Sequence, residues 1–243
     1  FDTYSGRSKS TDFNVQGWSY PDKIYQPAIP YNSVLIHFDW ICADLRAASI
    51  LSGDKELNDS FVLSDPYEHL ANKALNGCNE STRDHAKLLL LKTINKLDHD
   101  NDVVNDVYPG LCGWLSLLLS DIHVHQKSFN ILRRPYYLDT NRTDKSLLNA
   151  VLQGSVASAV QCVAWEIMKI FPNNLVCDIH DGIVMAAPKD PVIISNIINS
   201  VGTIFGRPFN GVFDANPFFP YKVYIGEYWK KWNLLKKVIS DQT

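Results

Sequence analysis

The chain has 243 residues, of which 46% are hydrophobic and 20% charged; these proportions are typical of folded proteins and exclude disordered and collagen-like chains. Its 26 acidic and 23 basic residues give a formal net charge of −3, which excludes a chain that is basic throughout but allows a local basic groove. The sequence has neither a long uninterrupted apolar run nor a signal-peptide pattern, so we expect an intracellular protein that is neither secreted nor in a membrane.

The first predicted elements are a strand and two helices. Residues 33–39 are apolar and β-rich, which predicts a strand that ends in the carboxylate Asp39. A helical pattern follows and ends at Gly53, where a glycine C-cap fits. Asp65 before Pro66 predicts the start of the next helix, because the carboxylate can accept a free backbone N–H and proline suits the first helical position.

The middle of the chain is predicted to be mainly helical. We expect Thr82 to cap a helix that ends near residue 97, a polar stretch over 98–106, and an apolar helix from Pro109 to about residue 119. A longer helix is predicted over about 145–170. It contains Gly154, which costs about 1 kcal/mol in a helix and therefore indicates close packing or a close ligand.

The last third predicts a β-hairpin, a helix and a final strand. Two apolar strands, 175–180 and 183–186, flank an Asp-Gly turn at Asp181. A helix is expected over about 191–205 and a strand over 221–227, followed by a basic amphipathic helix. That helix would hold Lys230, Lys231, Lys236 and Lys237, and we expect Trp40, Trp114 and Trp165 to lie in the core.

Asp39 and Asp181 both lie at predicted strand ends, so they would converge if their strands are neighbours in one sheet. Converging carboxylates bind divalent cations, and two Mg²⁺ ions held by such oxygens support phosphoryl transfer. An alternative interpretation is that both aspartates only form turns or caps.

Six segments, in chain order, resemble family-A DNA polymerases, the group of bacterial DNA polymerase I and the replicases of short-tailed phages. They begin with T-Y-S-G-R followed by N-V-Q at 3–16, D-W-I-C-A-D-L-R at 39–46 and T-R-D-H-A-K at 82–87. They continue with R-R at 133–134, N-A-V-L-Q-G-S at 149–155 and I-H-D-G at 179–182. The resemblance covers nearly the whole chain.

The resemblance implies the following site residues. Asp39 matches the first metal-binding aspartate, the carbonyl of Trp40 a second metal contact, and Asp181 the second metal-binding aspartate. Asp44 stands where the family has a Glu that helps to exclude a ribose 2′-hydroxyl, and Gly182 replaces the family's auxiliary Glu.

A second set of residues matches the nucleotide-binding helix of the family. Arg83 and Lys87 are one helical turn apart and would bind the incoming triphosphate. Leu91 stands where the family has a nucleotide-stacking Tyr or Phe. In an alternative register, K-T-I-N at 92–95 would put Lys92 in the lysine position.

The resemblance also implies contacts with primer and template. Their residues are polar or basic and are spread over four segments: Arg7, Asn14, Gln16, Arg133, Arg134, Lys145, Asn149, Gln153 and His180.

We therefore expect an α/β (α+β) polymerase palm with an antiparallel sheet and packed helices, shortened fingers and no thumb. The palm would comprise 1–80 and 127–243, and the reduced fingers 81–126. The expected function is template-directed DNA polymerisation, a nucleotidyl transfer of dNTPs to a primer 3′-hydroxyl with two Mg²⁺ ions, for which Mn²⁺ could substitute. Primer-template DNA and dNTPs would be its partners, and a second chain or a missing segment would supply thumb and exonuclease.

Two alternatives stay open. The first is a catalytically weak or inactive palm that acts as a DNA-binding or partner-binding module, which the altered nucleotide-binding helix would allow. The second is a metal phosphohydrolase built on His180 and Asp181, which would hydrolyse nucleotides without a template.

Overall fold

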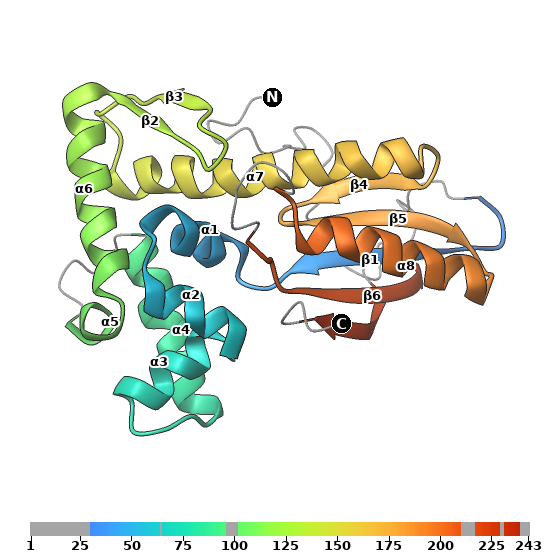
Figure 1. Cartoon of the computed structure of the whole chain (residues 1–243), viewed down its shortest axis with the longest axis horizontal. Coiled ribbons are helices and arrows are strands. Elements are labelled where there is room, and N and C mark those ends of the chain that lie inside the picture. The colour runs from blue at the N-terminus through green and yellow to red at the C-terminus, as the bar shows by residue number, and fades with distance from the viewer. Residues whose placement is uncertain (1–29, 64, 96–101, 210–216, 229–230, 239–243) are drawn as a thin grey trace. The chain divides into compact units, whose positions relative to one another are not determined.

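The computed structural model describes residues 30–63, 65–95, 102–209, 217–228 and 231–238 (Figure 1). The chain divides into two compact units, which we call the sheet unit (residues 1–43 and 156–243) and the helical unit (residues 44–155). Helix α7 (Asp144–Ile170) contributes to both. The predicted DNA contacts Arg7, Asn14 and Gln16 lie outside the described residues.

The sheet unit contains a five-stranded antiparallel sheet in the order β4–β5–β1–β6–β7 (Figure 1). The mixed α/β architecture with an antiparallel sheet is therefore confirmed. The strands are β1 (Ser33–Trp40), β4 (Leu175–Ile179), β5 (Gly182–Pro188), β6 (Tyr221–Tyr228) and β7 (Lys231–Val238).

Helix α8 (Pro191–Gly206) covers one face of this sheet. Phe38 and Trp40 of β1 point to that face, where their rings lie 5.7 and 4.5 Å from the ring of Phe205. The indole N–H of Trp40 donates to the carbonyl of Phe205 (2.8 Å). Because side chains alternate along a strand, Asp39 points to the opposite face of the sheet.

The predicted basic helix at the C-terminus is wrong, because these residues form the edge strand β7. Lys236 and Lys237 pair with Val223 and Lys222 of β6, and both lysines are exposed. A helix this short is marginal in isolation, whereas the strand is stabilised by its pairing with β6. Lysines on an exposed edge also discourage the addition of further strands. Lys230 lies outside the described residues.

The helical unit is built from short helices and one small hairpin. Its helices are α1 (Ala43–Ser52), α2 (Lys55–Leu63), α3 (Pro66–Ala74), α4 (Glu80–Ile94), α5 (Asp102–Val107), α6 (Pro109–His125) and the first part of α7. The hairpin joins β2 (Lys127–Phe129) to β3 (Pro135–Tyr137).

The predicted helix ends are mostly confirmed. Gly53 follows α1 with a φ of 64°, and Asp65 caps α3 by accepting the backbone N–H groups of Tyr67 and Glu68. Thr82 does not cap α4: Asn79 is the N-cap, and Thr82 is the third helical residue of a reciprocal capping box. The stretch predicted to be only a polar connection contains α5.

Asp54 connects two helix N-termini in the helical unit. One of its carboxylate oxygens accepts the N–H of Leu57 at the start of α2 (2.8 Å), and the other accepts the N–H of Leu111 in α6 (2.9 Å). A Cβ on Gly110 would lie 2.8 Å from the second oxygen, so glycine permits the close approach of α6 to Asp54.

Helix α7 is long and apolar enough to cross a membrane by length and composition, but 72% of its apolar window is buried inside the protein. Such burial is also typical of a core helix. Gly154 lies buried within α7, as expected from close packing. Trp165 on the same helix is 61% exposed, so the prediction that it belongs to the core is wrong.

Candidate active site

Asp39 and Asp181 lie at the same end of neighbouring strands, as the sequence predicts for a shared site. Asp39 pairs with Gly182, the first residue of β5. Asp181 directly precedes Gly182, and its carbonyl accepts the backbone N–H of Trp40 (3.3 Å). The antiparallel pairing of β1 with β5 therefore brings together two aspartates that are 142 positions apart, as their residue numbers give.

The turn that carries Asp181 consists of His180 and Asp181, one residue earlier than the predicted Asp-Gly turn. Ile179 and Gly182 close the hairpin, and the exposed His180 has a φ of 51°. Gly182 serves packing instead: a Cβ there would lie 2.5 Å from the carbonyl oxygen of Phe38 and 2.7 Å from Nε2 of His37. The family's Glu would not fit this position without a shift of the backbone.

The environment of Asp39 weakens its acidity. Burial raises the pKa of Asp39 to about 6, and the positive charge of Lys222 partly opposes this rise. Lys222 pairs with Asp39 across β1 and β6, and the next pair along the same face is His37 with Tyr224. Their rings stack at 5.8 Å, and burial together with the charge of Asp39 raises the pKa of Tyr224. Additional positive charge at this site would favour the ionised carboxylate.

The two carboxylates at this sheet end are candidate ligands for a magnesium ion. Carboxylate oxygens are the ligands that Mg²⁺ prefers, and the ion usually retains several waters or substrate phosphates. In the part of the chain that the structure describes, no three His, Cys, Asp or Glu side chains gather in a way that could hold a metal. Asp39 and Asp181 would thus supply two ligands and leave the other positions to a backbone carbonyl, water or substrate.

The predicted nucleotide-binding residues follow one side of α4 in the helical unit. Arg83, Lys87 and Leu91 recur every four residues, whereas Ala86 and Leu90 form part of the buried side. Lys87 and Leu91 are exposed, which leaves both accessible. Lys92, the alternative lysine, lies half-buried in the last turn.

Arg83 is held by Asp65, the N-cap of α3, and by Glu68 within α3. Its Nη2 and Nε atoms lie 2.6 and 3.2 Å from Oδ2 of Asp65, and its guanidinium group lies 5.5 Å from the ring centroid of Tyr67. Glu68 contributes a longer ion pair of 3.8 Å. Arg83 therefore joins α3 to α4, and a phosphate contact would require it to share or leave these partners.

Asp44, predicted to act in ribose discrimination, lies half-buried in the first turn of α1. The carboxylate thereby lies near the positive end of the helix dipole. Its role in selecting deoxyribose stays a prediction.

The predicted template contacts of the helical unit lie on α7 and at the tip of the β2–β3 hairpin. Lys145, Asn149 and Gln153 follow one side of α7 at intervals of four residues. The hairpin is attached to α7 beyond Gln153, because the backbone N–H of Ile131 donates to Oγ of Ser155 (3.0 Å). Its tip presents the exposed Arg133 and Arg134.

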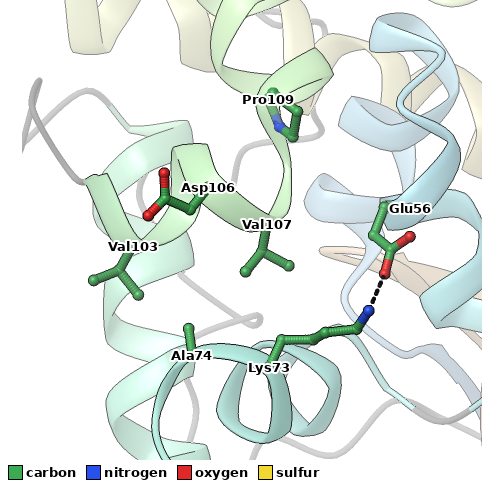
Figure 2. A pocket seen from close by; sticks show the side chains of 7 residues that line it. All are labelled: Glu56, Lys73, Ala74, Val103, Asp106, Val107 and Pro109. Atoms are coloured by element: carbon green, nitrogen blue, oxygen red, sulfur yellow. Dashed lines mark ion pairs between the residues drawn. The ribbon is translucent and has the colours of Figure 1, made fainter.

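A separate pocket of about 650 Å³ lies in the helical unit, between residues of α2, α3, α5 and α6 (Figure 2). Figure 2 shows Lys73 directed at Glu56, with which it forms an ion pair of 3.2 Å. Val103, Val107 and Pro109 supply apolar lining. No residue predicted from the sequence to act at the site lines this pocket.

Sequence reasoning missed three residues beside Asp39. Lys222 and Tyr224 border this carboxylate because β6 and β1 pair in a particular register, and His37 borders it within β1. Alternation along the strand is a signal for His37, which is two residues from Asp39. The sequence contains no comparable signal for Lys222 and Tyr224, because their position depends on the register between distant strands.

The fold is similar to that of a polymerase domain of known structure. Among solved structures, the chain is similar to the POL domain of Pol1 from M. smegmatis in complex with a DNA primer-template and dNTP, with a TM-score of 0.74. The similarity covers 93% of this chain and 46% of that chain at 17% sequence identity, so this chain spans about half the length of its structural neighbour and shares its fold. No protein-family model matches the sequence, and no curated protein matches it.

Proposed function

We propose that the chain is a template-directed DNA polymerase of the family-A type, acting inside the cell. The observation that carries this proposal is the position of Asp39 and Asp181 at one end of the adjacent strands β1 and β5. The similarity in fold to a polymerase domain solved in complex with a DNA primer-template and dNTP supports it. A further segment or a second chain would supply thumb and exonuclease.

The proposed reaction joins the primer 3′-oxygen to the α-phosphorus of a dNTP and releases pyrophosphate. Mg²⁺, or Mn²⁺ in its place, would make the primer hydroxyl more acidic and neutralise charge on the phosphates. Asp39 and Asp181, with the carbonyl of Trp40, would hold the ions. Because burial raises the pKa of Asp39 to about 6, its carboxyl group is mainly ionised at pH 7 and can act as a ligand.

The helical unit would supply the contacts that position the substrates. Lys87 is exposed on α4 and would bind the triphosphate together with Arg83, whereas Leu91 offers an apolar surface without a ring to stack. Asp44 would help to exclude a nucleotide with a ribose 2′-hydroxyl. Arg133, Arg134, Lys145, Asn149 and Gln153 would contact primer or template, together with His180 of the sheet unit.

A palm that binds DNA without catalysis is the second candidate. The ion pair of Arg83 with Asp65 favours it, because this pair occupies the arginine that the triphosphate would need. A sheet that retains both aspartates at one end argues for catalysis.

Primer extension tests the proposal. Wild type, Asp39→Asn and Asp181→Asn are compared on a primed template with Mg²⁺ and all four dNTPs. Asp178→Asn is the matched control, because Asp178 belongs to the same hairpin but pairs with Ile183, and alternation points it to the other face of the sheet from Asp39.

We expect templated extension in wild type and Asp178→Asn and a loss of at least about a hundredfold in the two site variants, since each removes a metal ligand. Extension that survives in both site variants would contradict the proposed site. DNA binding without extension by wild type would favour the binding module. Release of phosphate from dNTPs without a template would support the phosphohydrolase.

A further inference from the structure

The β2–β3 hairpin has one buried and one exposed face. Ser128 and Tyr136 pair across the two strands and are buried, with exposed fractions of 3% and 8%. The neighbouring pairs, Lys127 with Tyr137 and Phe129 with Pro135, point to the other face because side chains alternate along strands. Phe129 is 49% exposed and Tyr137 is 75% exposed.

A lysine joins the two exposed rings into one cluster. Nζ of Lys127 lies 4.9 Å from the ring centroid of Phe129 and 5.8 Å from that of Tyr137. These are cation–π distances, so the ammonium group and both rings form a single cationic, aromatic surface. We call Lys127, Phe129 and Tyr137 the hairpin platform.

The charges around the hairpin platform are mainly positive. Residues 127–145 contain five Lys and Arg residues but only two Asp residues. One of these acids, Asp144, lies 2.8 Å from Nε2 of His123, and the other, Asp139, accepts hydrogen bonds from Asn141. This segment therefore carries a net positive charge, which favours the approach of a polyanion.

The hairpin is held firmly enough to present the platform in one orientation. Asn130, only 2% exposed, accepts the N–H groups of Leu132 and Arg134 through its side-chain oxygen (3.0 and 2.9 Å). Its side-chain nitrogen lies within hydrogen-bond distance of the carbonyl of Gly154 in α7 (3.4 Å). An ordered aromatic surface loses little conformational entropy when a flat ligand stacks on it.

We propose that the hairpin platform binds unpaired bases of a single-stranded DNA segment, with Phe129 and Tyr137 stacking on the bases and Lys127, Arg133 and Arg134 contacting phosphates. Exposed aromatic rings beside basic residues are the means by which proteins bind single strands without sequence preference. The inference rests on the proposed function for the choice of DNA as ligand: the segment would be the unpaired part of the template.

Fluorescence anisotropy with the full chain tests the platform. The probe is a labelled oligothymidylate, compared with an abasic oligomer of equal length, without Mg²⁺ or dNTPs. The variants are Phe129→Ala, Tyr137→Ala and Tyr137→Trp. Trp165→Ala is the matched control: Trp165 is also exposed and lies 5.6 Å from Nζ of Lys169, but there Glu166 pairs with the lysine (2.6 Å).

We expect each of Phe129→Ala and Tyr137→Ala to weaken binding of the oligothymidylate about fivefold or more, the loss typical of one stacked base. Tyr137→Trp and Trp165→Ala should bind like wild type. The abasic oligomer should bind weakly to every protein and show little difference between them. Thermal unfolding of each variant checks that the exposed substitutions leave the fold intact.

If both alanine variants bound the oligothymidylate as tightly as wild type, the proposed binding of bases by the hairpin platform would be contradicted. If the alanine variants lost affinity for the abasic oligomer to the same extent, base stacking would be contradicted, because the hairpin would then act only through its charge. If the hairpin platform binds a protein partner instead of DNA, the oligomer should not bind. The result is independent of catalysis. If the chain binds the oligomer through the hairpin platform but never extends a primer, the proposed polymerase activity is contradicted and the binding of bases by the platform is still supported.

Discussion

Asp39 lies in a central strand with neighbours on both sides, and its carboxyl group titrates differently from that of an exposed aspartate. Burial raises its pKa from 3.8 to about 6. Because the folded protein holds this proton more tightly than the unfolded chain does, protonation of Asp39 stabilises the fold. The contribution is complete below about pH 4 and is lost as the pH rises through about 6.

Asp39→Asn mimics the protonated carboxyl group, and from this we expect a pH-dependent gain in stability. In EDTA at pH 8, the variant should exceed wild type by on the order of 3 kcal/mol in the free energy of unfolding. The difference should shrink towards zero near pH 4, as measured by urea unfolding across this range. Addition of Mg²⁺ at pH 8 should raise the Tm of wild type and leave that of the variant unchanged. A difference that does not vary with pH would show that Asp39 is not responsible.

At the residue scale, the candidate metal-binding aspartates were predictable from the sequence, whereas the residues that surround them were not. The sequence identified Asp39 and Asp181 because the segments around them resemble motifs of family-A DNA polymerases, and the structure confirms that their strands are neighbours. Lys222 could not be assigned to Asp39, since the register of β6 depends on packing along the whole sheet. The loss of a side chain at Gly182 became understandable only from the nearby Phe38 carbonyl and His37 ring.

Among the helices, the carboxylate of Asp65 both caps α3 and links α3 to α4. Oδ1 of Asp65 accepts two N–H groups at the start of α3, while Oδ2 binds Arg83 of α4. Asparagine caps helices as well as aspartate does, so Asp65→Asn retains the cap and removes the charge opposite Arg83. Asp65→Ala removes both contributions.

A double-mutant cycle measures how strongly the pair couples the two helices. We expect Asp65→Asn and Arg83→Gln each to lower the free energy of unfolding by about 1–2 kcal/mol, with little further loss in the double variant, because both remove the same interaction. Asp65→Ala should cost about 1 kcal/mol more than Asp65→Asn through the lost cap. Urea unfolding provides the values, and strictly additive losses would contradict the coupling.

The elements themselves differ in how well the sequence predicts them. Helices with local end signals, such as Asp65 with Pro66 before α3, were found because capping depends on neighbours in sequence. β7 was missed because its stability comes from β6, and a lysine-rich stretch with regular apolar residues suits a helix and an edge strand alike. α5 was missed because six residues are too few for a clear period.

For the whole molecule, the net charge of −3 requires that any DNA binding be local. Binding that neutralises phosphates releases counterions, so the logarithm of the affinity falls linearly with the logarithm of the salt concentration. Arg133, Arg134 and Lys145 are exposed basic residues of the helical unit, and Lys236 and Lys237 are exposed on β7 of the sheet unit. The proposed function assigns DNA contacts to the first group and none to the second.

We therefore expect primer-template DNA to bind with a strong salt dependence that individual substitutions change unequally. Arg133→Gln and Arg134→Gln should each weaken binding and reduce the slope by about one, the effect of losing one phosphate contact. Lys236→Gln and Lys237→Gln remove the same charge and should change neither quantity. Anisotropy titrations over a series of salt concentrations measure the slopes. Equal effects from both groups would mean that DNA responds only to the total charge, and the local basic surface would then have no role.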